Sequence, residues 1–125
     1  MSSQFKSRGG LGRIAGASRN TIAGLRSTWK TEHAFRQEVA VALPGMLVAL
    51  LLPVSALEKF LLIAVLLAVL LVELLNSALE AVVDRISLER HALSKHAKDA
   101  GSAAVFLSML IAAGAWAVVL VPLML

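Results

Sequence analysis

The stretch from residue 70 to residue 85, LLVELLNSALEAVVDR, combines a long apolar run with acidic and amide side chains. On a helix its polar groups fall on one face about 100° wide; they are Glu73, Asn76, Ser77, Glu80 and Asp84. Carboxylates are costly in hydrocarbon and almost always face protein or a water-filled cavity. This face is therefore predicted to point away from lipid, where its carboxylates can accept a proton or bind a divalent cation.

The depth of this polar face indicates which chemistry it supports. If the helix begins near Glu58 at the outer surface, Glu73 lies roughly 22 Å and Glu80 roughly 33 Å along it. Because a hydrocarbon core is about 30 Å thick, Glu73 falls in the inner third and Glu80 at the inner boundary. A proton or ion pathway would place its carboxylate near the midplane. The polar face instead suits a site where a water-soluble ligand meets a lipid headgroup.

Structural explanations stay open for part of this face. Asp84 can form an ordinary interfacial ion pair with Arg85, and Glu80 can form one near the following loop. Asn76 can serve as a hydrogen-bonding contact between helices. Glu73 is harder to explain in this way, because no Lys or Arg lies on its side of the helix within one turn. A functional role is therefore favoured for Glu73.

The sequence as a whole is that of a small integral membrane protein. Its 125 residues suffice for one domain, residues 1–125, and they are 58% hydrophobic with a mean hydropathy of +0.81. The absence of cysteine excludes disulfides and thiolate metal sites. Pro53 is predicted to end or kink the first membrane span, and Pro44 to lie near its start, where a missing N–H costs least. We predict an all-α membrane protein whose three transmembrane helices lie at residues 36–55, 58–88 (with a cytoplasmic extension) and 97–123.

The basic residues predict the orientation of the chain. Seven of the twelve, beginning with Lys6 and Arg8 and ending with Arg36, precede the charge-free stretch 39–57, and four lie between the apolar stretches 60–72 and 100–125. Only Lys59 lies between the first two apolar stretches, and no basic residue follows the third. The N-terminus and the second connection are therefore predicted to be cytoplasmic and the C-terminus outside, with no cleaved signal peptide. The net charge of +4 then reflects anionic lipid and topology, and no nucleic-acid partner is expected.

Residues 10–30 are predicted to form an amphipathic helix on the membrane surface. One helical stripe is apolar and consists of Leu11, Ile14, Ile22, Leu25 and Trp29. Basic side chains flank the stripe and can reach lipid phosphates, while Trp29 anchors the boundary. The alternative is a flexible basic arm that only sets topology.

Three sequence blocks, EHAFRQE (32–38), ELLNSALEAVVDR (73–85) and AKDAGSAAV (97–105), carry a family resemblance. In order, spacing and surrounding hydropathy they resemble the signature blocks of the bacterial integral membrane diacylglycerol kinases. The resemblance runs from about Gly12 to the end of the chain. It implies a homotrimeric helical bundle in the bacterial inner membrane, with active sites shared between neighbouring subunits. It also implies transfer of the γ-phosphate of ATP, with Mg²⁺ as cofactor, to diacylglycerol, giving phosphatidic acid.

The resemblance further implies roles for individual residues. Glu73 resembles the family's catalytic base, with Asn76 beside it, and Glu32 and Glu80 resemble the carboxylates that hold magnesium. The positions that resemble nucleotide-binding residues are Arg13, Asn20, Glu32, Glu80, Glu89, Arg90, His91, Lys98 and Asp99. The positions that resemble lipid-binding residues are Arg26, Ser27, Thr28, Trp29, Ala34, Phe35, Arg36, Gln37, Glu38, Glu73 and Ser102. Asn20 and Ile22 stand where the family often has an aromatic residue.

Three other functions compete with this interpretation. An undecaprenol kinase of the same family would share the catalytic block and phosphorylate a polyprenol. A small proton-coupled transporter or channel subunit would carry flux without consuming ATP, and a structural membrane adaptor would leave Glu73 unexplained. The sequence has no GxxxxGK[ST] loop and no protein-kinase signature, so any ATP site must differ from those of soluble kinases.

Overall fold

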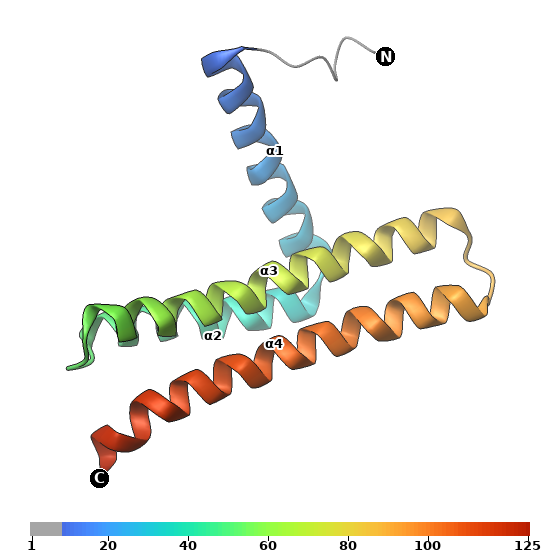
Figure 1. Cartoon of the computed structure of the whole chain (residues 1–125). Helices are drawn as coiled ribbons and strands as arrows, with labels where there is room; N and C mark the ends of the chain where they lie inside the picture. Colours follow the sequence, from blue (N-terminus) through green and yellow to red (C-terminus); the bar gives the residue numbers. More distant parts are fainter. Residues whose placement is uncertain (1–8) are drawn as a thin grey trace.

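Four helices make up nearly all of residues 9–125, the part of the chain that this computed structural model describes (Figure 1). Figure 1 shows α2, α3 and α4 side by side, with α1 projecting away from them. No strand occurs in residues 9–125, so the predicted all-α fold is confirmed there. Lys6 and Arg8, which contribute to the predicted orientation, lie outside the described residues. The helices are α1 (Gly10–Thr31), α2 (His33–Leu51), α3 (Ala56–Ile86) and α4 (Ala92–Met124).

The central helix of the fold is α3, which packs against each of the other three. By length and composition α2, α3 and α4 are long and apolar enough to cross a membrane, as the sequence predicts. The connections between them are only a few residues long, so consecutive helices run antiparallel. This arrangement places the polar face of α3 where both α2 and α4 can cover it.

The two prolines of the first span have different effects on α2. α2 ends at Leu51, two residues before Pro53, which agrees with the prediction that this proline stops the helix. The predicted position of Pro44 near the helix start is wrong, because α2 begins at His33 and Pro44 lies in its interior. Pro44 cannot donate a hydrogen bond to the carbonyl of Ala40. The polar segment 33–38 belongs to the same helix as the apolar residues that follow it, so α2 begins six residues before the charge-free stretch does.

The polar side chains at the turn between α2 and α3 cap the two helices. The Ser55 hydroxyl accepts a hydrogen bond from the Glu58 backbone N–H at 3.1 Å, and the Glu58 carboxylate accepts one from the Ser55 N–H at 3.1 Å. The Lys59 ammonium donates to the Leu50 carbonyl near the end of α2 at 2.7 Å. These groups satisfy backbone atoms that a helix end leaves unpaired.

The apolar core is small and lies along α3. One cluster contains Ala49, Leu62 and Val119, and a second contains Val65, Val69 and Ala112. Trp116 packs against both clusters, and its indole N–H donates to the Leu62 carbonyl at 3.3 Å. Many large apolar side chains of α2, α3 and α4 are exposed in the single chain. Such surfaces suit lipid or neighbouring helices, since lipid tails are as apolar as leucine.

We expect Ser55→Ala to lower the free energy of unfolding by about 1 kcal/mol, because it removes the side-chain cap of α3. The measurement is denaturation in detergent micelles. Ser18→Ala is the matched control, since the Ser18 side chain makes no hydrogen bond within the described residues. Equal stability of the two variants would contradict a structural role for this cap.

Candidate active site

The polar face of α3 runs from the protein interior to solvent. Glu73 and Asn76 are only 5% and 8% exposed, Ser77 and Glu80 are half-buried, and Asp84 is exposed. The prediction that this face points toward protein is confirmed for Glu73 and Asn76. The carboxylates become more buried with distance from the C-terminal end of α3, from Asp84 through Glu80 to Glu73. That end of α3 lies next to the start of α4.

Glu32 reaches this face from the junction between α1 and α2. It is the single non-helical residue between them, with φ −110° and ψ 108°. Its carboxylate accepts a hydrogen bond from the Ser77 hydroxyl at 3.2 Å. The Arg36 guanidinium donates to the Trp29 carbonyl at 3.0 Å and so holds the end of α1 against α2. The junction therefore brings Glu32 beside residues that lie far away in the sequence.

Asn76 has one satisfied and one unsatisfied polar atom. Its amide nitrogen donates to the Glu80 carboxylate at 2.9 Å, so its hydrogen bond lies within α3 and not between helices. Its amide oxygen is buried without a partner among residues 9–125. That oxygen packs against Gly101 of α4, where a Cβ atom would lie 2.0 Å from it. Only glycine permits this approach, and the sequence reasoning did not single Gly101 out.

Four carboxyl groups gather where the C-terminal half of α3 meets the start of α2. Glu32, Glu38 and Glu80 all lie close enough to act on the Glu73 carboxyl group. Glu38 belongs to α2, and one Glu38 oxygen is buried without a partner in the described part of the chain. Neighbouring carboxylates repel one another unless a proton or a cation intervenes. This cluster can therefore take up a proton, which relieves that repulsion.

A groove that we call the acidic groove opens between α1 and α3, with a volume of about 570 Å³. Its acidic lining residues are Glu32, Glu80 and Asp84, and Ser27 and Thr28 line it from α1. The Thr28 hydroxyl donates its proton to the Gly24 carbonyl at 2.8 Å, so toward the groove it can act only as a hydrogen-bond acceptor. Residues 9–125 contain no group of three or more His, Cys, Asp or Glu side chains arranged to hold a metal ion.

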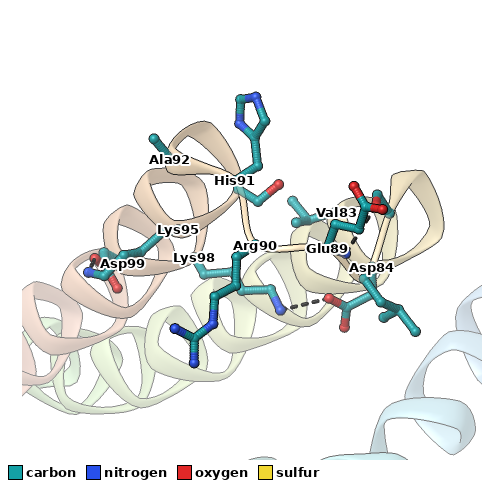
Figure 2. Close-up of a pocket in the computed structure, with 12 residues that line it drawn as sticks. Val83, Asp84, Glu89, Arg90, His91, Ala92, Lys95, Lys98 and Asp99 are labelled. Atoms are coloured by element: carbon teal, nitrogen blue, oxygen red, sulfur yellow. Dashed lines mark hydrogen bonds and ion pairs between the residues drawn. The ribbon is translucent and has the colours of Figure 1, made fainter.

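A second groove, the loop groove, lies between the end of α3 and the start of α4 and has a volume of about 720 Å³ (Figure 2). The Lys98 ammonium reaches across it to the Asp84 carboxylate at 2.6 Å, and Lys95 pairs with Asp99 at 2.5 Å. The loop groove brings together five of the predicted nucleotide-binding residues, Glu89, Arg90, His91, Lys98 and Asp99.

Two side chains at this groove have contacts that the sequence did not predict. Asp84 pairs with Lys98 and not with Arg85, because adjacent residues on a helix do not face each other. The ring of His91 caps α4 by accepting a hydrogen bond from the Leu93 N–H at 3.0 Å. Figure 2 shows this ring pointing away from the Lys98–Asp84 pair. His91 thus has a structural use in addition to its predicted place at the groove.

The remaining predicted residues are distributed over other surfaces. Arg13, Asn20 and Arg26 are exposed on α1, and none of the three lines either groove. An apolar groove of about 440 Å³, lined mainly by α2 with contributions from α3 and α4, includes Ala34, Gln37 and Glu38. Among the other predicted lipid-binding residues, Phe35 is buried, Arg36 is half-buried, and Trp29 and Ser102 are exposed.

Comparison with known proteins gives one consistent result. The prokaryotic diacylglycerol kinase family matches residues 19–120. A diacylglycerol kinase of Pseudomonas aeruginosa is 50% identical over 118 residues, which cover 94% of this chain and 96% of that protein. The chain belongs to the prokaryotic diacylglycerol kinase family.

Other members of the family show similar coverage. The diacylglycerol kinase of Escherichia coli strain K12 is 46% identical over 111 residues, which cover 89% of this chain and 91% of that protein. The diacylglycerol kinase of Haemophilus influenzae is 41% identical over 107 residues, which cover 86% of this chain and 91% of that protein. The family and enzyme class predicted from the three sequence blocks are confirmed.

We expect Gly101→Ala to lower the free energy of unfolding by about 1–3 kcal/mol, because the added methyl group displaces the buried Asn76 amide. The same displacement breaks the hydrogen bond from Asn76 to Glu80 and should lower kinase turnover. Gly114→Ala on the same helix is the control, since nothing lies within 4 Å of its Cβ position. It should be neutral or stabilise by up to about 1 kcal/mol. Similar denaturation curves for both variants in micelles would show that Gly101 is not a close-packing position.

Proposed function

We propose that the chain transfers the γ-phosphate of ATP to the hydroxyl group of diacylglycerol, giving phosphatidic acid, at the cytoplasmic face of the bacterial inner membrane. Family membership and three apolar helices support a membrane-bound lipid kinase. The observation that carries the proposal is that Glu32 and Glu80 both line the acidic groove and both lie close to the buried carboxyl group of Glu73.

Glu73 is the proposed catalytic base. Phosphoryl transfer needs precise positioning, charge stabilisation and one group that accepts the hydroxyl proton. Glu73 is the most buried acidic group of the polar face, and Asn76 lies one turn away with an unused amide oxygen. The lipid would approach along the apolar groove, where Glu38 and Gln37 mark the polar end. The remaining lipid-binding residues predicted on α1 and at Ser102 would contact the headgroup region.

Glu32 and Glu80 are the proposed magnesium ligands. Both carboxylates line the acidic groove, and the amide nitrogen of Asn76 donates a hydrogen bond that holds the Glu80 carboxylate in place. Mg²⁺ prefers oxygen ligands and usually takes one or two protein carboxylates together with nucleotide phosphates. These residues therefore fit the ion, which when bound would neutralise charge on the phosphates.

The loop groove is the proposed nucleotide site. Lys98 and Arg90 supply positive charge for the phosphates there, and Glu89, His91 and Asp99 line the same groove. The acidic groove shares Asp84 with the loop groove, so the two are contiguous at this residue. A nucleotide in the loop groove can thus direct its terminal phosphate toward Glu32 and Glu80.

α1 is proposed to lie on the cytoplasmic membrane surface as an amphipathic helix. Its apolar stripe is exposed in the chain, as a surface that binds lipid requires. Basic residues before α2 and around the α3–α4 connection support a cytoplasmic location for both segments and an outside location for the C-terminus. Residues 1–125 would then form one kinase domain.

A homotrimer with shared active sites is part of the proposal. Arg13 and Asn20, both predicted to contact the nucleotide, line neither groove of their own chain. A neighbouring subunit could bring its α1 to these grooves, which would complete the nucleotide site. The exposed apolar surfaces of α2, α3 and α4 are suited to such helix packing.

We expect Glu73→Gln to fold and bind MgATP normally but to lose about 10²- to 10⁴-fold in turnover, because glutamine cannot accept the hydroxyl proton. Lipid phosphorylation in mixed micelles and a nucleotide titration measure the two properties. Glu58→Gln is the matched control at the other end of α3, where glutamine can also complete the capping box. Near-normal phosphorylation by Glu73→Gln would refute the proposed base, and ion flux in liposomes without ATP would favour a transporter.

The lipid substrate is tested by offering diacylglycerol and undecaprenol in competition with labelled ATP. We expect phosphatidic acid to be the main product. The ratio of the two labelled lipids, separated after short incubation, measures the preference. Preferential labelling of the polyprenol would replace diacylglycerol with a polyprenol substrate while leaving the kinase reaction in place.

A further inference from the structure

The Lys98–Asp84 ion pair joins α4 to α3 at the border between the two grooves. The ammonium and carboxylate lie 2.6 Å apart, a distance typical of a charge-assisted hydrogen bond. Both residues line the loop groove, and Asp84 also lines the acidic groove. Figure 2 shows the Lys98 side chain extended from α4 toward Asp84, whereas the Arg90 guanidinium points elsewhere.

The exposure of the pair argues against stability as its main purpose. The side chains of Lys98 and Asp84 are 43% and 46% exposed. Ion pairs as exposed as this contribute little to folding, because solvent screens them and both side chains lose freedom. An apolar contact at this position would join the helices equally well. The more informative property of the Asp84 carboxylate is the position in which it holds the Lys98 ammonium.

The chemistry of lysine allows one ammonium to serve two partners. Its three N–H donors can bond a carboxylate and phosphate oxygens together, while its four-carbon stem is flexible when nothing holds it. Asp84 restricts that flexibility and keeps the ammonium where the loop groove meets the acidic groove. In the proposed reaction the γ-phosphate of a nucleotide in the loop groove moves to the lipid hydroxyl while Glu73 accepts the hydroxyl proton, so a cation at this border lies on the side of the groove that faces the acidic groove.

We propose that Asp84 is a positioning residue that holds the Lys98 ammonium at the border of the two grooves, so that Lys98 meets the transferred phosphoryl group. This inference rests on the proposed function, in which Lys98 contacts nucleotide phosphates. Asp84 acts through Lys98 and touches neither the lipid nor the reacting atoms. It also explains why the polar face of α3 continues to Asp84, beyond the carboxylates that surround Glu73.

The test compares Asp84→Asn with the unaltered chain in mixed micelles, with ATP varied at saturating diacylglycerol. We expect kcat/KM for ATP to fall about 10- to 100-fold, since a misplaced catalytic group costs this much. The thermal unfolding midpoint should be unchanged. Arg85→Gln is the matched control, because it removes a charge from the adjacent position. Arg85 forms no ion pair within the described residues, so the kinetics of this variant should match those of the parent. A lower KM for ATP in Asp84→Asn would overturn the proposal, since Asp84 would then compete with phosphate for Lys98.

Two further variants separate positioning from a structural role. Asp84→Glu keeps the charge but shifts the ammonium, so we expect intermediate kcat/KM at parental stability. In a Lys98→Gln background, Asp84→Asn should cause no further loss of kcat/KM. An additive loss, or a fall in thermal stability with kinetics intact, would refute the positioning role.

The outcomes for the two residues are distinguishable. Full activity of Lys98→Gln would refute the phosphate contact in the proposed function itself. Inactive Lys98→Gln together with fully active Asp84→Asn would refute only the role of Asp84. Should Asp84→Asn unfold, the ratio of kcat/KM between Asp84→Glu and the parent decides the question, with parental values counting against the proposal.

Discussion

A carboxylate on a membrane-spanning helix must face protein or water, because transfer of its charge into hydrocarbon costs several kcal/mol. This constraint determines how α3 is oriented in the bundle. Glu73 is buried, so α2 and α4 must lie on either side of the face that carries it. The opposite face of α3 is apolar and exposed in the single chain, where lipid or another subunit can cover it. The position of the carboxyl cluster thus follows from the cost of exposing it to lipid.

The two ends of α3 use their polar residues differently. At its N-terminal end, Ser55 and Glu58 satisfy each other's backbone N–H groups and Lys59 satisfies a carbonyl of α2. Toward its C-terminal end, the amide oxygen of Asn76 and one oxygen of the neighbouring Glu38 are buried without partners in the described residues. Buried polar atoms are nearly always paired, so these two acceptors are free for a proton, water or a ligand. The structure therefore separates a capped end from an end with unused buried acceptors among residues 9–125.

Three contacts between distant segments assemble the region around the C-terminal half of α3. Ser77 bonds Glu32 across the α1–α2 junction, Lys98 pairs with Asp84 across the α3–α4 loop, and Gly101 permits α4 to approach Asn76. The first contact places a predicted magnesium ligand, Glu32, beside the polar face of α3, and the second places a predicted nucleotide-binding residue, Lys98, there. The third lets α4 pack closely against the predicted catalytic residue Asn76. Together they make the acidic groove and the loop groove neighbours at Asp84. A reaction that joins nucleotide to lipid needs such contiguity, since phosphoryl transfer depends chiefly on positioning.

The sequence by itself determined the helical class, the three apolar helices, the direction of the polar face and, through its three blocks, the family. These features depend on local periodicity and composition, which are readable residue by residue. Only the tertiary structure decided the partner of Asp84, the capping role of His91, the interior position of Pro44 and the need for Gly101. Those depend on how closely helices approach and on which side chains meet across them. Side-chain contacts between segments far apart in the chain are set by three-dimensional packing, and helical spacing within one segment does not encode them.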